Sequence, residues 1–270
     1  MVLRPAGRCP AGVLLVRTQA IAVNHVDTYV RSGAYPTPLT FPFVIGRDAV
    51  GTVAAVGAGV SGFTEGDPVW CNSLGHGGRQ GPSATYTAVA AERLYHLPDG
   101  VDPVAAAAVL HTGATAHLGL SREARLRIGE IIVVGGAAGG VGGAVLQIAA
   151  SAGARVIAVA RSDQASWCRA NGAQEVLDYQ APDLAGHLRR AAPDGIDVYW
   201  DMPAHGHDRS PIGRDPIWHQ PQCRHLMPTP LVGVVRAANG GTGRRVAARR
   251  RAGARSNGLT CFSLLRSRQA

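Results

Sequence analysis

Hydrophobic residues in the middle of the chain alternate between two kinds of segment. Residues 130–135 (Glu-Ile-Ile-Val-Val-Gly) form a short apolar run, which is typical of a strand buried on both faces. Val141, Val145 and Ile148 then recur at helical spacing, and residues 155–160 form a second apolar run. Further along, the pattern predicts a helix over 162–172, a strand over 176–179, a helix over 182–192 and a strand over 196–201. This alternation predicts a parallel α/β sheet.

The first hundred residues have a different pattern of hydrophobic and polar positions. Residues 13–17 and 49–56 read as strands, and glycine, proline and aspartate punctuate the segments between such runs. A stretch rich in alanine, residues 103–110, reads as a helix. We therefore expect a compact β-rich domain over residues 1–105, followed by the α/β domain over residues 106–201.

The periodic pattern stops after Asp201. The chain has 270 residues, 46% of them hydrophobic, and a net charge of +9. Residues 1–201 carry 15 Arg against 16 Asp and Glu, a charge of −1, whereas residues 202–270 carry 12 Arg against 2 Asp, a charge of +10. The excess charge therefore belongs to the last 69 residues, for which the composition predicts an irregular basic tail.

Two further observations bound the class of protein. No apolar run approaches the roughly 20 residues that a membrane-spanning helix needs, and the first residues do not resemble a signal peptide. The five cysteines show no paired spacing, which argues against a disulfide framework and a structural zinc lobe. We expect a cytoplasmic protein with reduced thiols and no membrane partner.

A glycine-rich turn joins the first apolar run to the helix that follows it. Gly136, Gly139 and Gly142 are spaced so that a dinucleotide pyrophosphate could approach the backbone N–H groups of a helix N-terminus. The strand before, the helix after and the second strand about 20 residues on complete the fingerprint. The residues predicted to bind the cofactor here are Gly136, Ala138, Gly139, Gly140, Val141 and Gly142. The alternative is a glycine-rich turn in some other α/β sheet.

The end of the second strand distinguishes between the two nicotinamide dinucleotides. Folds that bind NAD usually place an acidic residue there, but this chain has Arg161 and Ser162. An arginine could pair with the 2′-phosphate of NADPH. We therefore expect NADPH as the cofactor, the alternative being that Arg161 is merely a solvated residue after a strand.

Several motifs in order resemble the medium-chain dehydrogenase/reductase superfamily, in its zinc-independent quinone oxidoreductase branch, which is similar to zeta-crystallin. They are residues 22–29 (Ala-Val-Asn-His-Val-Asp-Thr-Tyr), Arg31-Ser32-Gly33-x-Tyr35, Gly46-x-Asp48-x-x-Gly51, Gly66-Asp67-x-Val69, Leu97-Pro98-Asp99-Gly100 and the glycine-rich turn. The resemblance implies a GroES-like substrate domain, residues 1–105, and an incomplete Rossmann domain with a doubly wound parallel sheet, residues 106–201. It also implies a homodimer.

The resemblance also suggests which residues act. Zinc-dependent relatives carry a cysteine where this chain has Asn24 and a histidine where it has Arg47, so we expect no metal. Asn24, Tyr29 and Tyr35 match positions that line the substrate site, and we expect them to orient a carbonyl or quinone oxygen, with Asp27 as their positioning residue. The alternative for each tyrosine is a packed aromatic ring.

Two more residues match positions near the cofactor. Thr115 matches a position near the nicotinamide, although a threonine at the start of a helix is the alternative. Tyr179 matches a position near the adenosine phosphate, and could equally be a core residue. A departure from the family is Ala138, which stands where a serine is usual.

The tail suggests a further hypothesis. A complete member would continue after Asp201 with two more parallel strands, so we expect a truncation or a change of reading frame near this point, an uncovered strand edge, and a lost dimer contact.

The expected function is the reduction of a quinone or an α,β-unsaturated carbonyl by NADPH without zinc. The enoyl reductase module of a polyketide synthase is harder to distinguish from it. The alternatives outside this class are an inactive fragment and a protein that binds nucleic acid without sequence preference through Arg244, Arg245 and residues 249–251.

Overall fold

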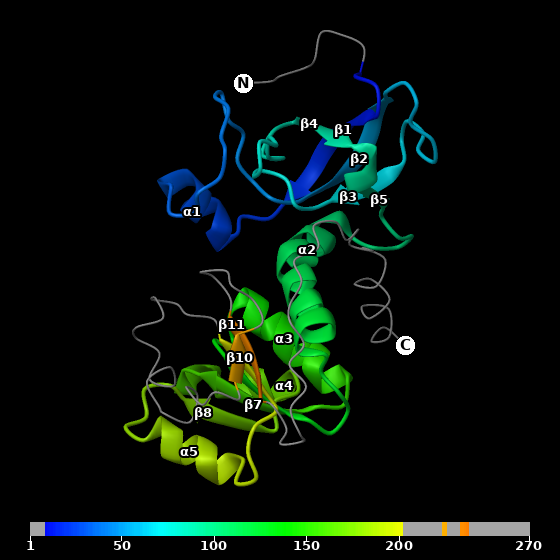
Figure 1. Cartoon of the computed structure of the whole chain (residues 1–270). Coiled ribbons are helices and arrows are strands. Elements are labelled where there is room, and N and C mark those ends of the chain that lie inside the picture. Colours follow the sequence, from blue (N-terminus) through cyan, green and yellow to red (C-terminus); the bar gives the residue numbers. More distant parts are fainter. Residues whose placement is uncertain (1–8, 202–222, 226–232, 238–270) are drawn as a thin grey trace, which may run out of the picture. The chain divides into compact units, whose positions relative to one another are not determined.

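The computed structural model describes residues 9–201, 223–225 and 233–237 (Figure 1). The chain divides into two compact units, Met1–His111 and Thr112–Ala270, here called the N-terminal and C-terminal units. The division falls inside the helix α2 (Pro103–Leu118), a short way beyond the boundary that the sequence predicts after residue 105.

An antiparallel sheet of five strands forms the N-terminal unit, in the order β4-β1-β2-β3-β5. The strands are β1 (Val13–Ile21), β2 (Ala49–Val56), β3 (Pro68–Cys71), β4 (Tyr86–Ala90) and β5 (Leu94–His96), with a 3₁₀ turn, η1 (Ala91–Arg93), before the last strand. Leu14, Val16, Val69 and Val89 are almost completely buried in its core. The β-rich domain that the sequence predicts is therefore confirmed.

The helix α1 (His25–Ser32) follows β1 and carries several of the predicted catalytic residues. Asn24 precedes its first turn, and the backbone N–H of Asn24 donates to Oδ2 of Asp27 at 2.8 Å. The helix ends at Gly33, whose φ of 77° is in the left-handed region that favours glycine. Both ends of α1 are thus defined by local sequence, which places Asn24 and Asp27 side by side.

A six-stranded sheet forms the centre of the C-terminal unit, in the order β10-β11-β9-β6-β7-β8. Four strands, β6 (Ile131–Gly135), β7 (Arg155–Ala160), β8 (Glu175–Asp178) and β9 (Val198–Asp201), pair in parallel. The hydrophobic core against this sheet includes buried side chains of the strands themselves, namely Ile132 and Val134 of β6 and Val156 and Ala158 of β7. The parallel α/β sheet is therefore confirmed.

The helices alternate with these strands as the sequence predicts, although most are shorter. They are α3 (Gly140–Ser151), α4 (Ala165–Ala170), which follows a 3₁₀ turn, η3 (Ser162–Gln164), and α5 (Leu184–Ala191). The helix α2 is longer than the predicted stretch and continues into η2 (Gly119–Ala124), a π-helical segment. The extension follows from its many alanines, which favour helix without a strong apolar periodicity.

The expectation of an uncovered sheet edge at β9 is wrong. A strand from beyond Asp201, β11 (Gly233–Ala237), pairs with β9 in the antiparallel sense, and β10 (Cys223–His225) pairs with β11. The hydrophobic pattern did not predict this pairing because the two strands are separated by some thirty residues of sequence. Residues 202–222, 226–232 and 238–270, with the predicted arginine cluster, lie outside the described residues.

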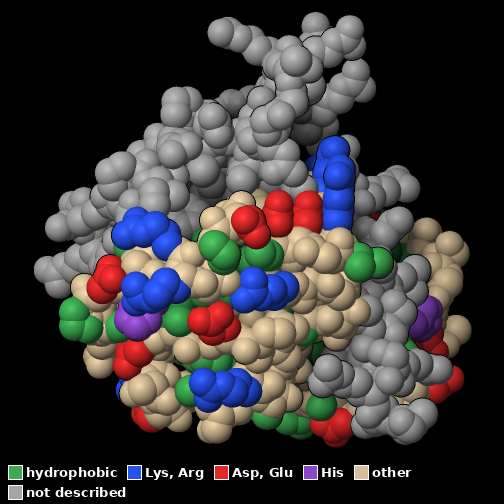
Figure 2. Space-filling model, turned by 90° about the horizontal axis from the view of Figure 1, so that it is seen from below, with side chains coloured by type: hydrophobic (Ala, Val, Ile, Leu, Met, Phe, Trp, Pro, Cys, Tyr) green, Lys and Arg blue, Asp and Glu red, His purple; other side chains and the backbone are tan. Residues whose placement is uncertain are grey.

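Charged side chains of both signs are interspersed over the described surface in Figure 2. This mixture agrees with the charge of −1 over residues 1–201. Within the described ranges, no helix is long and apolar enough to cross a membrane.

Candidate active site

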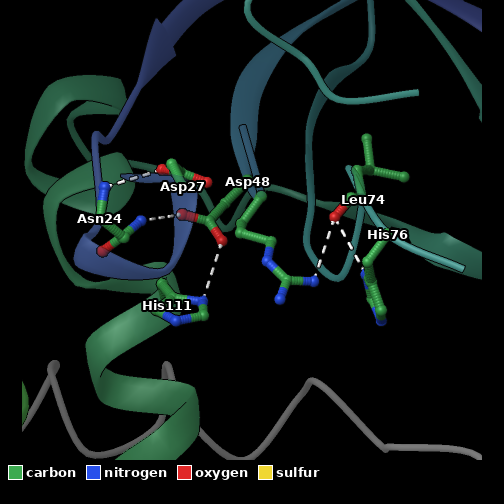
Figure 3. A network of polar contacts seen from close by, with 7 residues as sticks. Asn24, Asp27, Asp48, Leu74, His76 and His111 are labelled. Carbon is green, nitrogen blue, oxygen red and sulfur yellow. Dashed lines mark hydrogen bonds and ion pairs between the residues drawn. The ribbon is translucent and has the colours of Figure 1, made fainter. Parts of the chain in front are cut away.

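A buried carboxylate lies at the centre of the polar residues of the N-terminal unit (Figure 3). Asp48, directly before β2, is completely buried. Its Oδ2 accepts a hydrogen bond from Nδ2 of Asn24 at 3.2 Å, and its Oδ1 lies 3.6 Å from Nδ1 of His111. The second distance is too long for a hydrogen bond and is an ion pair when the imidazole is protonated. Asp48 therefore links α1 to α2.

Asp27 is the second buried carboxylate of this group, with 5% of its surface exposed. Burial raises the pKa of Asp27, and the nearby Asp48 carboxylate raises it further. The hydrogen bond from the Asn24 backbone and the charges of His111 and Arg47 act in the opposite direction. Because Asp27 bonds the backbone of Asn24 while Asp48 bonds its side chain, Asn24 is held at two points.

Arg47 lies next to Asp48 and is also buried, with 6% of its surface exposed. Its Nη1 donates to the carbonyl oxygen of Leu74 at 3.4 Å, and its guanidinium carbon lies 5.3 Å from the centre of the Tyr35 ring. This is a cation–π contact. Tyr35 is therefore held against a buried positive charge.

The two predicted tyrosines differ in their surroundings. The backbone N–H of Tyr35 donates to the carbonyl of Tyr29 at 3.0 Å, so the two residues are close in the fold, and both side chains are half-buried. Within the described part of the chain, no hydrogen bond connects the Tyr29 hydroxyl to Asn24 or Asp48. The structure thus brings Asn24 and Asp27 together, and places Tyr35 against Arg47 and beside the backbone of Tyr29.

Sequence reasoning missed His111. It is one of two histidines in an alanine-rich helix, and no local pattern distinguishes it. Arg47 and Asp48 belong to a recognised motif, but the sequence indicated only that Arg47 does not match a zinc ligand. Within the described ranges, no three His, Cys, Asp or Glu side chains come together as a metal site would require.

The glycine-rich turn lies between β6 and α3 in the C-terminal unit. Gly136 has a φ of 64°, and the N–H of Gly139 donates to the carbonyl of Gly136 at 2.9 Å. A Cβ on Gly142 would overlap the same carbonyl, so this position excludes a side chain. The helix α3 begins at Gly140, and Gly139 and Gly140 are exposed. The turn therefore leaves the helix N-terminus open to an anion, which suits a dinucleotide pyrophosphate.

Arg161 follows β7 and is paired with a nearby acid. Its Nη2 lies 2.8 Å from Oδ2 of Asp163, and its Nε lies 3.1 Å from Oδ1. Both side chains are more than half exposed. Ser162, between them, begins the turn η3. Arg161 is therefore a solvated residue after a strand that is also paired with Asp163, and any phosphate would have to compete with this carboxylate.

The alternatives for the two remaining cofactor residues are wrong. Thr115 lies well inside α2 rather than at a helix start. Tyr179 is 44% exposed and is therefore not a core residue, although its backbone N–H bonds Ala160 at the end of β7. Tyr179 and Arg161 thus both follow the carboxyl ends of neighbouring strands.

Family models match both parts of the chain. The model described as "Alcohol dehydrogenase GroES-like domain" matches residues 10–99, and the model described as "Zinc-binding dehydrogenase" matches residues 140–210. The first covers the sheet of the N-terminal unit, and the second begins at the start of α3.

Curated relatives and solved structures agree with these matches. A rat quinone oxidoreductase is 37% identical over 191 residues, which are 70% of this chain and 57% of the rat protein. A mouse quinone oxidoreductase is 33% identical over 238 residues, which are 82% of this chain and 71% of the mouse protein. A mycobacterial structure complexed with NADPH is 36% identical with a TM-score of 0.62, covering 71% of this chain and 58% of that one.

The chain thus spans little more than half the length of the rat relative, and its two family matches stand in the same order as its two units. It belongs to the medium-chain dehydrogenase/reductase superfamily, in the quinone oxidoreductase branch.

Proposed function

We propose that this protein is an oxidoreductase that uses NADPH to reduce a quinone or an α,β-unsaturated carbonyl compound without zinc. The observation that carries the proposal is the turn from Gly136 to Gly142, where a side chain at Gly142 would overlap the backbone and the helix N-terminus is exposed. This arrangement suits the pyrophosphate of a dinucleotide. The relatives named quinone oxidoreductase support the substrate class.

The residues of each unit suggest a separate role for that unit in the reaction. The glycine-rich turn would hold the pyrophosphate, and the bound reduced nicotinamide would supply a hydride. In the N-terminal unit, the amide of Asn24 and the hydroxyl of Tyr35 would donate to the substrate oxygen, where negative charge develops. Asp27 and Asp48 hold Asn24 from its backbone and its side chain, so the amide is fixed before the substrate binds.

Reduction also requires a proton. A quinone that accepts a hydride, with its two electrons, becomes a hydroquinone only after one proton reaches its oxygen. His111 is the candidate to carry that proton, because an imidazole can donate a proton near neutral pH and its Nδ1 lies 3.6 Å from Oδ1 of the buried Asp48. The imidazole would regain its proton from water after each turnover.

The preference for NADPH rests on Arg161 and on the mycobacterial relative whose structure contains NADPH. The guanidinium at the end of β7 can pair with a 2′-phosphate once it leaves Asp163. The Asp163 carboxylate lies close to this guanidinium, so it should weaken the preference for NADPH without removing it.

Titration with NADPH and NADH, followed by reduction of 1,4-naphthoquinone, tests this function. We expect NADPH to bind more tightly than NADH and to be oxidised when the quinone is added. Gly142→Ala should abolish both nucleotide binding and turnover, and Ser151→Ala, at an exposed position of α3, is the control. Binding without turnover would favour the inactive fragment, whereas tight, salt-sensitive DNA binding with no nucleotide binding would overturn the proposal.

A further inference from the structure

Three basic side chains of the N-terminal unit converge on the segment 73–76, and one of them, Arg47, also contacts Tyr35. The Nη1 of Arg47 and the Nδ1 of His76 both contact the carbonyl oxygen of Leu74, at 3.4 and 3.1 Å. The Nη2 of Arg79 lies 3.0 Å from Nε2 of the same imidazole. We call Arg47, His76 and Arg79 the basic cluster. The carbonyl of Leu74, which Figure 3 shows between Asp48 and His76, is the point where two of its members meet.

The basic cluster makes no direct contact with a carboxylate in the described part of the chain, although the charge of Arg47 acts on Asp27. Within the described ranges, neither Arg47 nor Arg79 forms an ion pair with Asp or Glu, and the Nε of Arg47 is buried without a hydrogen-bond acceptor. The neighbouring Asp48 instead contacts Asn24 and His111. A buried donor of a charged group that lacks an acceptor is costly, so this place suits a negatively charged group from outside the chain.

The titration behaviour of the basic cluster agrees with this shortage of negative charge. Burial lowers the pKa of Arg79, and the charges of Arg93 and Arg47 lower it further. Burial also lowers the pKa of His76, and the charges of all three arginines act in the same direction. Like charges gathered without an acid repel one another, and an anion would relieve that repulsion.

We propose that the basic cluster binds a carboxylate group of the substrate, so that the preferred substrates are acidic quinones or enones. The proposal rests on the proposed function, because it names the substrate class of the same site. Arg47 connects the two, since its guanidinium contacts both Leu74 and the ring of Tyr35, the residue expected to orient the substrate oxygen. A carboxylate bound to the basic cluster would thus place the reacting carbonyl near Tyr35.

If the same residues had a purely structural role, their substitution would have a different effect on substrate preference. Arg47 and Arg79 each donate to a backbone carbonyl of the segment 73–74, and these bonds could serve only to hold that segment. Such a role would affect neutral and acidic substrates equally. The two roles are therefore distinguished by a matched pair of substrates that differ only in charge.

Anthraquinone-2-carboxylate and 2-(hydroxymethyl)anthraquinone form such a pair. In steady-state assays with NADPH, we expect Arg79→Gln to lower kcat/KM for the carboxylate about tenfold and to change that for the alcohol less than about twofold. Arg122→Gln, an exposed arginine of the C-terminal unit, should leave both values unchanged. An equal loss for both substrates in Arg79→Gln would overturn the proposal in favour of the structural role.

A binding measurement keeps this test independent of turnover. Without nucleotide, the carboxylate should quench tryptophan fluorescence at a Kd that rises about tenfold in Arg79→Gln and rises with added NaCl, while the Kd of the alcohol should not change. If the protein binds the carboxylate in this way but reduces no quinone, the proposed function fails and the anion site stands. If wild type and variant bind both compounds equally, the anion site fails whatever the outcome of the enzyme assay.

Discussion

The Nδ1 atom of His111 lies 3.6 Å from the Oδ1 atom of Asp48, a carboxylate with no exposed surface. The other oxygen of Asp48 accepts from the side chain of Asn24. One buried carboxylate thus contacts both Asn24, the proposed hydrogen-bond donor to the substrate, and His111, the proposed proton donor. These contacts allow the role of each residue to be tested separately.

Substitution of His111 by glutamine should reduce kcat for quinone reduction about a hundredfold, because general acid catalysis contributes on this order. Binding of NADPH should change less than kcat, because the residues proposed to hold the pyrophosphate are those of the turn from Gly136 to Gly142. Stopped-flow measurement of NADPH oxidation gives the rate. In His111→Ala, added imidazole should restore part of the activity; unchanged kcat in both variants would contradict a role in proton supply.

The pKa of Asp27 provides a prediction about stability. Burial raises this pKa above its ordinary value of 3.8, so the folded protein holds the proton more tightly than the unfolded chain does. The stability that Asp27 contributes is therefore fully present below pH 3.8 and is lost as the pH rises through the raised folded value. The Asp27→Asn variant lacks this titrating carboxyl group, so its stability should lack this dependence on pH.

Urea unfolding of the wild type and of Asp27→Asn between pH 3.5 and 7, in the same buffers, measures this effect. The free energy of unfolding of the wild type should fall relative to that of the variant as the pH rises. Asp194→Asn, at an exposed position, is the control and should follow the wild type. Wild-type and Asp27→Asn curves that stay parallel would contradict a raised pKa.

Local sequence was sufficient to predict the parts of the fold that depend on neighbouring residues. The strand before Gly136 and the helix from Gly140 are formed by residues adjacent in sequence, so their pattern predicts both. The pairing of β11 with β9 and the contact of His111 with Asp48 join distant residues. Neither contact produces a periodic pattern of hydrophobic residues. For this reason an uncovered edge was expected, and His111 was not identified from the sequence.

The same reason explains the incomplete prediction at Arg161. The residue type indicated a phosphate partner, and Asp163 lay at the start of the helix predicted over 162–172. Their pairing depends on the turn η3, which brings the two side chains together after β7. The position of the arginine could be predicted, but its local competitor could not.

Asp163→Asn should increase the preference for NADPH over NADH. The substitution removes a carboxylate that occupies the Arg161 guanidinium and repels a 2′-phosphate. Because the pair is exposed, the gain should be modest, about two- to fivefold in the ratio of the two Kd values. Arg161→Asp should lower the same ratio below that of the wild type. Fluorescence titrations with both nucleotides measure it, and a ratio that neither variant changes would exclude a role for this arginine.

Gly119 packs directly beneath the ring of Trp200, which has no exposed surface. A Cβ at residue 119 would overlap the outer carbons of the indole, so Gly119→Ala should destabilise the C-terminal unit by about 1–3 kcal/mol. The substitution of glycine by alanine in a helix would otherwise be favourable by up to about 1 kcal/mol. Urea unfolding followed by circular dichroism measures the difference.

A double-mutant cycle identifies the contact responsible. Trp200→Phe removes the outer carbons of the indole and also a buried Nε1 donor that has no hydrogen-bond partner. The single variant should lose stability through the cavity that it leaves. In the double variant Gly119→Ala with Trp200→Phe, the new methyl group fits into that cavity, so the loss should be smaller than the sum of the two single losses. Strictly additive losses would show that Gly119 is required for a reason other than its contact with Trp200.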